Sequence, residues 1–179
     1  MMQPRHAKAL IAGAAILALA GCDANPTGKN RVFVENPPPT LPVSINAMMV
    51  GMVDDSADML WAVGNGDLPR DEHDWYLVRN SAYQTIIGSK AMQLAGTGPN
   101  DVDWVADPEW QRLSDELSAI GMEALSLAEA QQVEGWDALG DRLVQNCLAC
   151  HEQFKPEIPS EGILHESTER ESRGISIFD

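Results

Sequence analysis

The most constraining feature of the sequence is a set of segments in which apolar residues recur at intervals of three and four. The clearest runs from Trp110 to Leu127, and the segment from Ile45 to Val63 repeats one apolar face in the same way. Such spacing places apolar side chains along one face of an α-helix. No segment alternates with period two over a convincing length, so the sequence predicts an all-α fold.

Turn and capping residues divide these segments into four expected helices. The first runs from Ile45 to the stop at residues 64–66, and the second covers about residues 71–95. The third begins at Asp107-Pro108, an N-cap acceptor followed by proline at the first helical position. The fourth covers about residues 133–154, before Pro156. Four helices with short to moderate connections favour an antiparallel four-helix bundle over residues 42–156.

The first 21 residues are expected to be a signal peptide. Arg5 and Lys8 precede an apolar run over residues 9–20, which is short for a membrane-spanning helix. The end of this run, Leu19-Ala20-Gly21-Cys22, resembles the bacterial lipobox, in which the cysteine is acylated and becomes the mature N-terminus. The alternative is an ordinary signal peptide followed by an incidental cysteine. Residues 22–41 are rich in Pro, Asn and Thr and are expected to form a flexible tether.

The chain is strongly acidic, with 12 Lys and Arg against 27 Asp and Glu and a formal charge of −15. This balance disfavours nucleic acid as a partner, and it disfavours electrostatic attachment to an anionic membrane. A protein partner recognised through charge would have a basic surface. Residues 157–179 form an acidic tail with few core-forming residues.

The chemistry of the sequence is concentrated in Cys147-Leu148-Ala149-Cys150-His151. Cys-x-x-Cys-His is the attachment signature of covalent c-type haem, in which two thioethers hold the porphyrin and the histidine ligates iron. The three side chains stand at helical offsets of zero, three and four, so they share one helix face, which is also the apolar one. A redox-active dithiol is typical of a fold with alternating strands and helices, which this sequence does not show. A zinc site at the two cysteines would need further ligands, and the remaining candidates are scattered along the chain: His6, Cys22, His73 and His165.

A motif at the end of a fourth helix, followed by Phe154 and Lys155, resembles the cytochrome c-prime family, the class II c-type cytochromes. The family typically has an aromatic residue three positions after the histidine and a basic residue at the fourth. The resemblance implies one covalent haem c per chain, held by Cys147, Cys150 and His151. The chain departs from simple members in its lipobox, its acidic tail and a loop over residues 96–107 that contains Trp104. The tail and the loop would therefore affect how far the haem is exposed.

The resemblance implies two modes of action. In one, a methionine of the first helix is the sixth iron ligand and the protein carries single electrons; in the other, five-coordinate iron binds nitric oxide or carbon monoxide. Bundle geometry leaves Met48, Met49, Met52 and Met92 at a suitable height, and Met49 is the first choice because it lies on the apolar stripe of its helix. Met48 is a close second, since helix phase alone does not separate the two. Met48, Met49 and Met52 could instead all fill the core.

These observations predict an electron carrier, not an enzyme, since no pairing of a nucleophile with a base is visible. We expect it in the bacterial cell envelope, on the periplasmic side, held to a membrane by lipid on Cys22. Its expected partner is a redox protein with a basic surface. Members of the family often form homodimers, although the sequence shows no interface.

Overall fold

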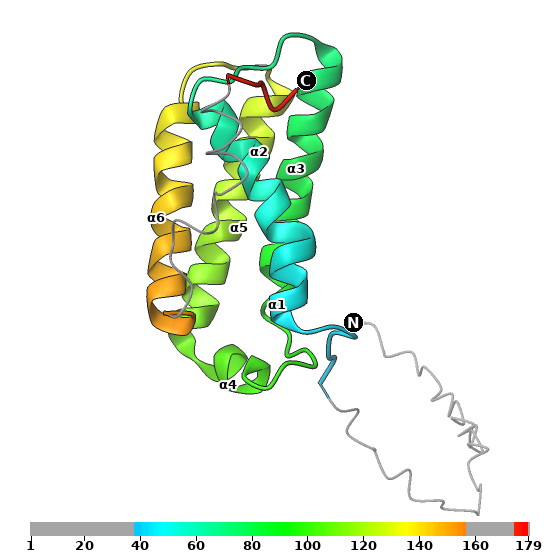
Figure 1. Cartoon of the computed structure of the whole chain (residues 1–179), viewed down its shortest axis with the longest axis vertical. Helices are drawn as coiled ribbons and strands as arrows, with labels where there is room; N and C mark the ends of the chain where they lie inside the picture. The colour runs from blue at the N-terminus through cyan, green and yellow to red at the C-terminus, as the bar shows by residue number, and fades with distance from the viewer. Residues whose placement is uncertain (1–37, 157–173, 179) are drawn as a thin grey trace, which may run out of the picture. The chain divides into compact units, whose positions relative to one another are not determined.

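A computed structural model describes residues 38–156 and 174–178, and all the regular structure in them is helical (Figure 1). The elements are α1 (Ile45–Met48), the π-helical turn η1 (Met49–Val53), α2 (Asp54–Gly64), α3 (Glu72–Ala91), α4 (Asp101–Ala106), α5 (Pro108–Glu129) and α6 (Trp136–Phe154). The prediction of an all-α fold is confirmed for this part of the chain. The signal peptide, Cys22 and most of the tether and of the acidic tail lie outside the described residues. Among the helices described, none has the length and apolarity needed to span a bilayer.

Side-chain caps begin three of the helices, and the one at Asp107 confirms the prediction from the sequence. The Ser44 hydroxyl accepts the Ala47 N–H at the start of α1, and Asp71 accepts the His73 and Asp74 N–H groups at the start of α3. The Asp107 carboxylate accepts the Glu109 N–H at the start of α5. These side chains satisfy amide groups that lack an intrahelical partner, so each fixes the residue at which its helix begins.

The fourth expected helix begins later than the apolar pattern predicts, at Trp136 instead of about Val133. Gln131 and Gly135 adopt positive φ values of 49° and 95°, so the backbone turns before α6 can start. A left-handed conformation costs glycine little, and Gly135 is therefore suited to the residue directly before the helix.

The first helical stretch is continuous from Ile45 to Gly64, but its hydrogen bonding changes in the middle. In η1 the Asp54 N–H donates to the carbonyl of Met49, five residues earlier, instead of four as in an α-helix. A π turn rotates the residues that follow it relative to those that precede it, and such turns are frequent at functional sites. A sequence pattern with a uniform helical period does not predict this change.

The four long stretches form a helical bundle (Figure 1). The stretch that ends in α2 packs against α3 and α6, and α5 packs against the same two helices. A Cβ on Gly64, at the end of α2, would lie 3.0 Å from the Cα of Gly140, near the start of α6, so these helices run in opposite directions and cross closely. The Trp110 indole N–H, near the start of α5, donates to the carbonyl of Met92, at the end of α3 (2.8 Å).

Short helix α4 lies in the segment expected to be a loop. Its first residue, Asp101, is 2% exposed, and one carboxylate oxygen accepts the N–H groups of Ile45 (3.0 Å) and Gly98 (2.9 Å). Thr97 N–H also donates to the carbonyl of Val43 (3.2 Å). This segment is therefore fastened to the start of the first helical stretch, at the end of the bundle where α6 finishes.

The described end of the tail, residues 174–178, attaches to the connection between α2 and α3. Ser176 Oγ and Ile177 N–H both donate to the carboxylate of Asp67. Arg70 donates to the carbonyl of Phe178 (2.8 Å), and its guanidinium lies 5.8 Å from the centre of the Phe178 ring. These residues thus lie at the end of the bundle opposite the last turns of α6.

Candidate functional site

The residues of the Cys-x-x-Cys-His motif occupy the last turns of α6. Cys147 and Cys150 are free thiols and, like His151, are half-buried. The helix ends at Phe154, because Lys155 leaves the helical conformation (φ −140°) and Pro156 follows. The motif therefore lies at the C-terminal end of the helix, as expected from the sequence.

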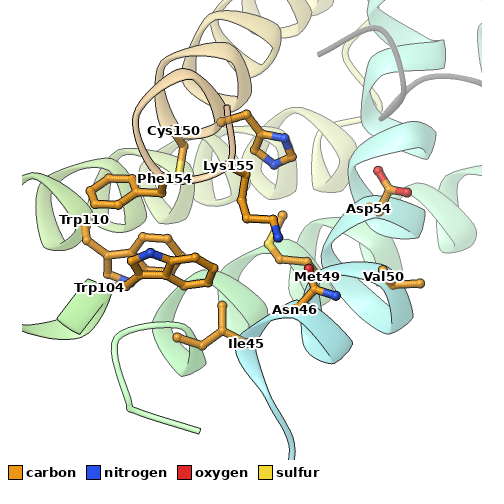
Figure 2. A pocket seen from close by; sticks show the side chains of 11 residues that line it. Ile45, Asn46, Met49, Val50, Asp54, Trp104, Trp110, Cys150, Phe154 and Lys155 are labelled. Atoms are coloured by element: carbon orange, nitrogen blue, oxygen red, sulfur yellow. The ribbon is translucent and has the colours of Figure 1, made fainter. Parts of the chain in front are cut away.

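Cys150 and His151 line a cavity between α6, the first helical stretch and the aromatic residues of α4 and α5 (Figure 2). The space between its walls, including the open mouth, is about 810 Å³. Its other lining residues come from these elements: Ile45, Asn46, Met49, Val50, Asp54, Trp104, Trp110, Phe154 and Lys155. The cavity thus has mostly apolar and aromatic walls, one ammonium group and one carboxylate.

A second, deeper cavity shares Met49, Asp54, Cys150 and His151 with the first. It extends to Cys147 and to the buried core between α5 and α6. Both thiols and the imidazole of the motif therefore adjoin hollow space inside the bundle.

The candidate methionines occupy different environments. Met49 is half-buried and lines both cavities together with His151. Met92 is 4% exposed and lines only the deeper one, whereas Met48 is 8% exposed, belongs to the core and lines neither. Met52 lies beside α3, since a Cβ on Gly88 would be 3.5 Å from its sulfur. Of the three candidate methionines in the first stretch, Met48, Met49 and Met52, the structure brings only Met49 to the cavities with His151.

Burial raises the pKa of both thiols, to about 12 for Cys147 and about 11 for Cys150. The Asp54 carboxylate contributes to the shift at Cys147 and that of Glu109 to the shift at Cys150, because nearby negative charge disfavours a thiolate. Reactive dithiols have a lowered pKa. The pair consequently lacks the electrostatic environment of a redox-active Cys-x-x-Cys.

Within residues 38–156 and 174–178, no group of three or more His, Cys, Asp and Glu side chains is arranged to hold a metal ion. A structural zinc site needs four such donors. A zinc site at Cys147 and Cys150 would therefore require ligands from outside this part of the chain.

An aromatic cluster forms the wall of the larger cavity on the side of α4. The rings of Trp104 and Trp110 stack with centroids 5.2 Å apart and planes 16° apart, and Phe154 meets Trp110 edge-on at 5.1 Å. The Lys155 ammonium lies 5.9 Å from the centre of the Trp104 ring. Phe154 and Lys155 belong to the motif found in the sequence.

Sequence reasoning did not identify Asp54 or Trp110 as residues of the site. Trp110 is on a regular apolar stripe, which is the usual pattern of a core residue, and Asp54 is one of many acids. Trp104 was noted only as part of the loop over residues 96–107. Nothing in the linear pattern indicates that these three side chains meet at one cavity.

No protein-family model, curated protein or solved structure matches this chain. The functional conclusion therefore depends on the residues of the site and their surroundings.

Proposed function

We propose that the protein is a c-type cytochrome, in which thioethers from Cys147 and Cys150 would hold one haem and the His151 imidazole would ligate its iron. The observation that carries this proposal is the Cys-x-x-Cys-His sequence at the end of α6, with Cys150 and His151 on the wall of a mostly apolar cavity. Both cysteines are free thiols, which is the state that can add to the vinyl groups of haem.

The surroundings fit such a group. The cavity adjoins both the Cys150 thiol and the His151 imidazole, so a group held by both side chains would occupy it. Cofactor pockets combine apolar and aromatic walls with a few polar groups, as this one does. The Lys155 ammonium is the basic side chain lining this cavity and is suited to a carboxylate of the bound group.

Among c-type cytochromes, we propose the cytochrome c-prime family, with an antiparallel four-helix bundle and the haem near the end of its fourth helix. The support is the motif with Phe154 and Lys155 after it, and the order of the four long helical stretches. In this assignment Met49 would be the second protein ligand of the iron, because it lines both cavities together with His151.

Electron transfer is the proposed activity, and the protein is proposed to be a carrier and not an enzyme. When bound, the haem supplies a one-electron iron couple. The chain's own contribution is to hold the group covalently, to fix the His151 imidazole at the end of a rigid helix and to surround both with a low-dielectric wall. Rigid ligands and a dry environment set the reduction potential.

The proposed location is the periplasmic side of the bacterial cell envelope, with lipid on Cys22 as the membrane anchor. The proposed redox partner has a basic surface, because the chain carries a formal charge of −15. Cys22 lies outside the described residues, and its role depends on the lipobox sequence alone.

Expression with a c-type maturation system tests the proposal. The mature protein should carry one haem that stays on the polypeptide after acid-acetone extraction, and Cys147→Ala and Cys150→Ala should each lose one thioether. Leu148→Ala and Ala149→Ser, within the same motif, serve as controls that keep both. A protein that gains no haem mass would refute the proposal.

Optical and EPR spectra of the same sample then distinguish the two modes of action. A low-spin ferric spectrum supports an electron carrier with six-coordinate iron. A high-spin spectrum and rapid carbon monoxide binding would instead support the alternative, a five-coordinate protein that binds or senses nitric oxide or carbon monoxide.

A further inference from the structure

Helix α4 supplies one wall of the larger cavity through a single side chain, Trp104. This indole is half-buried and packs against the core on one side, and it lines the cavity that contains Cys150 and His151 (Figure 2). Trp104 therefore forms the α4 side of the cavity that is also lined by two of the proposed haem-binding residues.

The backbone that carries Trp104 is held at both of its ends. Asp101, at the start of α4, is buried and accepts the backbone N–H groups of Ile45 and Gly98. Past the tryptophan, the carbonyl of Val105 accepts the side-chain amide of Gln111 from α5 (2.8 Å). These bonds join α4 to the first helical stretch and to α5.

The indole itself is in contact with two side chains. It stacks on Trp110, which is 3% exposed and whose own N–H is bonded to the carbonyl of Met92. The Lys155 ammonium lies over the Trp104 ring at a distance that allows a cation–π interaction. Both contacts favour one orientation of the ring at the cavity.

We propose that Trp104 determines the access of small molecules to the centre at Cys150 and His151, by closing the α4 side of the cavity. This inference deepens the proposed function and rests on it. A wall of aromatic side chains would limit the approach of water and diatomic ligands from the α4 side, and such a limit favours electron transfer over gas binding. Replacing the indole by a smaller side chain should open the cavity towards solvent.

The rate at which carbon monoxide associates with the ferrous protein tests this proposal, measured by flash photolysis. All variants carry Met49→Ala as well, so that the proposed sixth ligand does not compete. Trp104→Ala should raise the association rate about tenfold or more, which corresponds to a barrier lower by ~1.4 kcal/mol. Trp104→Phe keeps an aromatic side chain in the wall and should raise the association rate by less than about threefold.

Trp61→Ala is the matched control. Trp61 is also half-buried, but it lies near the end of α2, at the opposite end of the bundle from the last turns of α6. Its replacement should leave the association rate unchanged. An unchanged rate in Trp104→Ala, or an equal rise in Trp61→Ala, would overturn the assignment of access to Trp104.

If the protein carries no haem, the proposed function fails and the role of Trp104 is still measurable. The Cys150 thiol lines the same cavity, so its alkylation by iodoacetamide reports the access of a small reagent. Trp104→Ala should then speed the alkylation of Cys150 about tenfold relative to Trp61→Ala. Equal alkylation rates in the two variants would overturn the proposal for the haem-free protein.

Discussion

Neighbouring methionines of the first helical stretch provide the sharpest test of the proposed iron coordination. Met48 and Met49 are adjacent in sequence, and helical phase alone does not separate them. In the structure, Met48 is 8% exposed and belongs to the core, whereas Met49 is half-buried and lines both cavities with His151. Replacing each by alanine should therefore affect different properties of the protein.

The expected magnitudes follow from burial. Truncating a fully buried methionine to alanine costs about 2–5 kcal/mol of unfolding free energy, so Met48→Ala should cost ~3 kcal/mol. Met49 is only half-buried, so the packing loss in Met49→Ala should be ~1–2 kcal/mol. Its larger effect should be on the iron, because loss of a thioether ligand would convert low-spin iron into a high-spin form, which binds carbon monoxide once it is reduced to the ferrous state.

Two measurements on each variant separate the roles. Urea unfolding gives the change in stability, and optical and EPR spectra give the spin state. We expect Met48→Ala to be the less stable protein with an unchanged low-spin spectrum, and Met49→Ala to be the more stable one with a high-spin spectrum. An unchanged low-spin spectrum in Met49→Ala, or a high-spin spectrum in the unsubstituted protein, would show that Met49 is not a ligand.

Further predictions concern the anchor, the fold and the partner. Cys22→Ser should move the protein from the membrane fraction to the soluble envelope fraction, and an unsubstituted protein found wholly in the soluble fraction contradicts lipidation. Asp101→Ala should lower the unfolding free energy by ~2–4 kcal/mol in urea titrations, because the buried N–H of Ile45 and the partly buried N–H of Gly98 lose their acceptor. A loss below ~1 kcal/mol would contradict this. The hydrogen bond from Arg70 lowers the pKa of Asp74 below its ordinary value of 3.8. The stability that this carboxylate contributes is therefore present above about pH 4, and it is lost as the pH falls through the lowered pKa. Asp74→Asn should therefore flatten the acid limb of the stability profile, and an unchanged limb would exclude this contribution. Electron transfer to an acceptor with a basic surface should slow between low and moderate salt, whereas a rate independent of salt would indicate that the acidity serves solubility.

The sequence by itself determined the helical class and most helix starts. Apolar steps of three and four residues require a helical face to be buried, and Asp71 and Asp107 mark two starts through local bonds to nearby N–H groups. The spacing of Cys147, Cys150 and His151 likewise needs only helix geometry to place the three side chains on one face. These features depend on residues within a few positions of each other, which is why a linear pattern contains them.

Only the tertiary structure decided which side chains surround the helix face that carries Cys147, Cys150 and His151. The π turn at Met49–Val53, the helix that carries Trp104 and the attachment of residues 174–178 to Asp67 were not predictable from local pattern. Each depends on contacts between segments that are far apart in the chain, as when Asp101 accepts the N–H of Ile45, 56 residues away. The different environments of Met48 and Met49 also depend on contacts between distant segments. A cavity is formed by several helices together, so the sequence of one helix does not specify which of its side chains will line it.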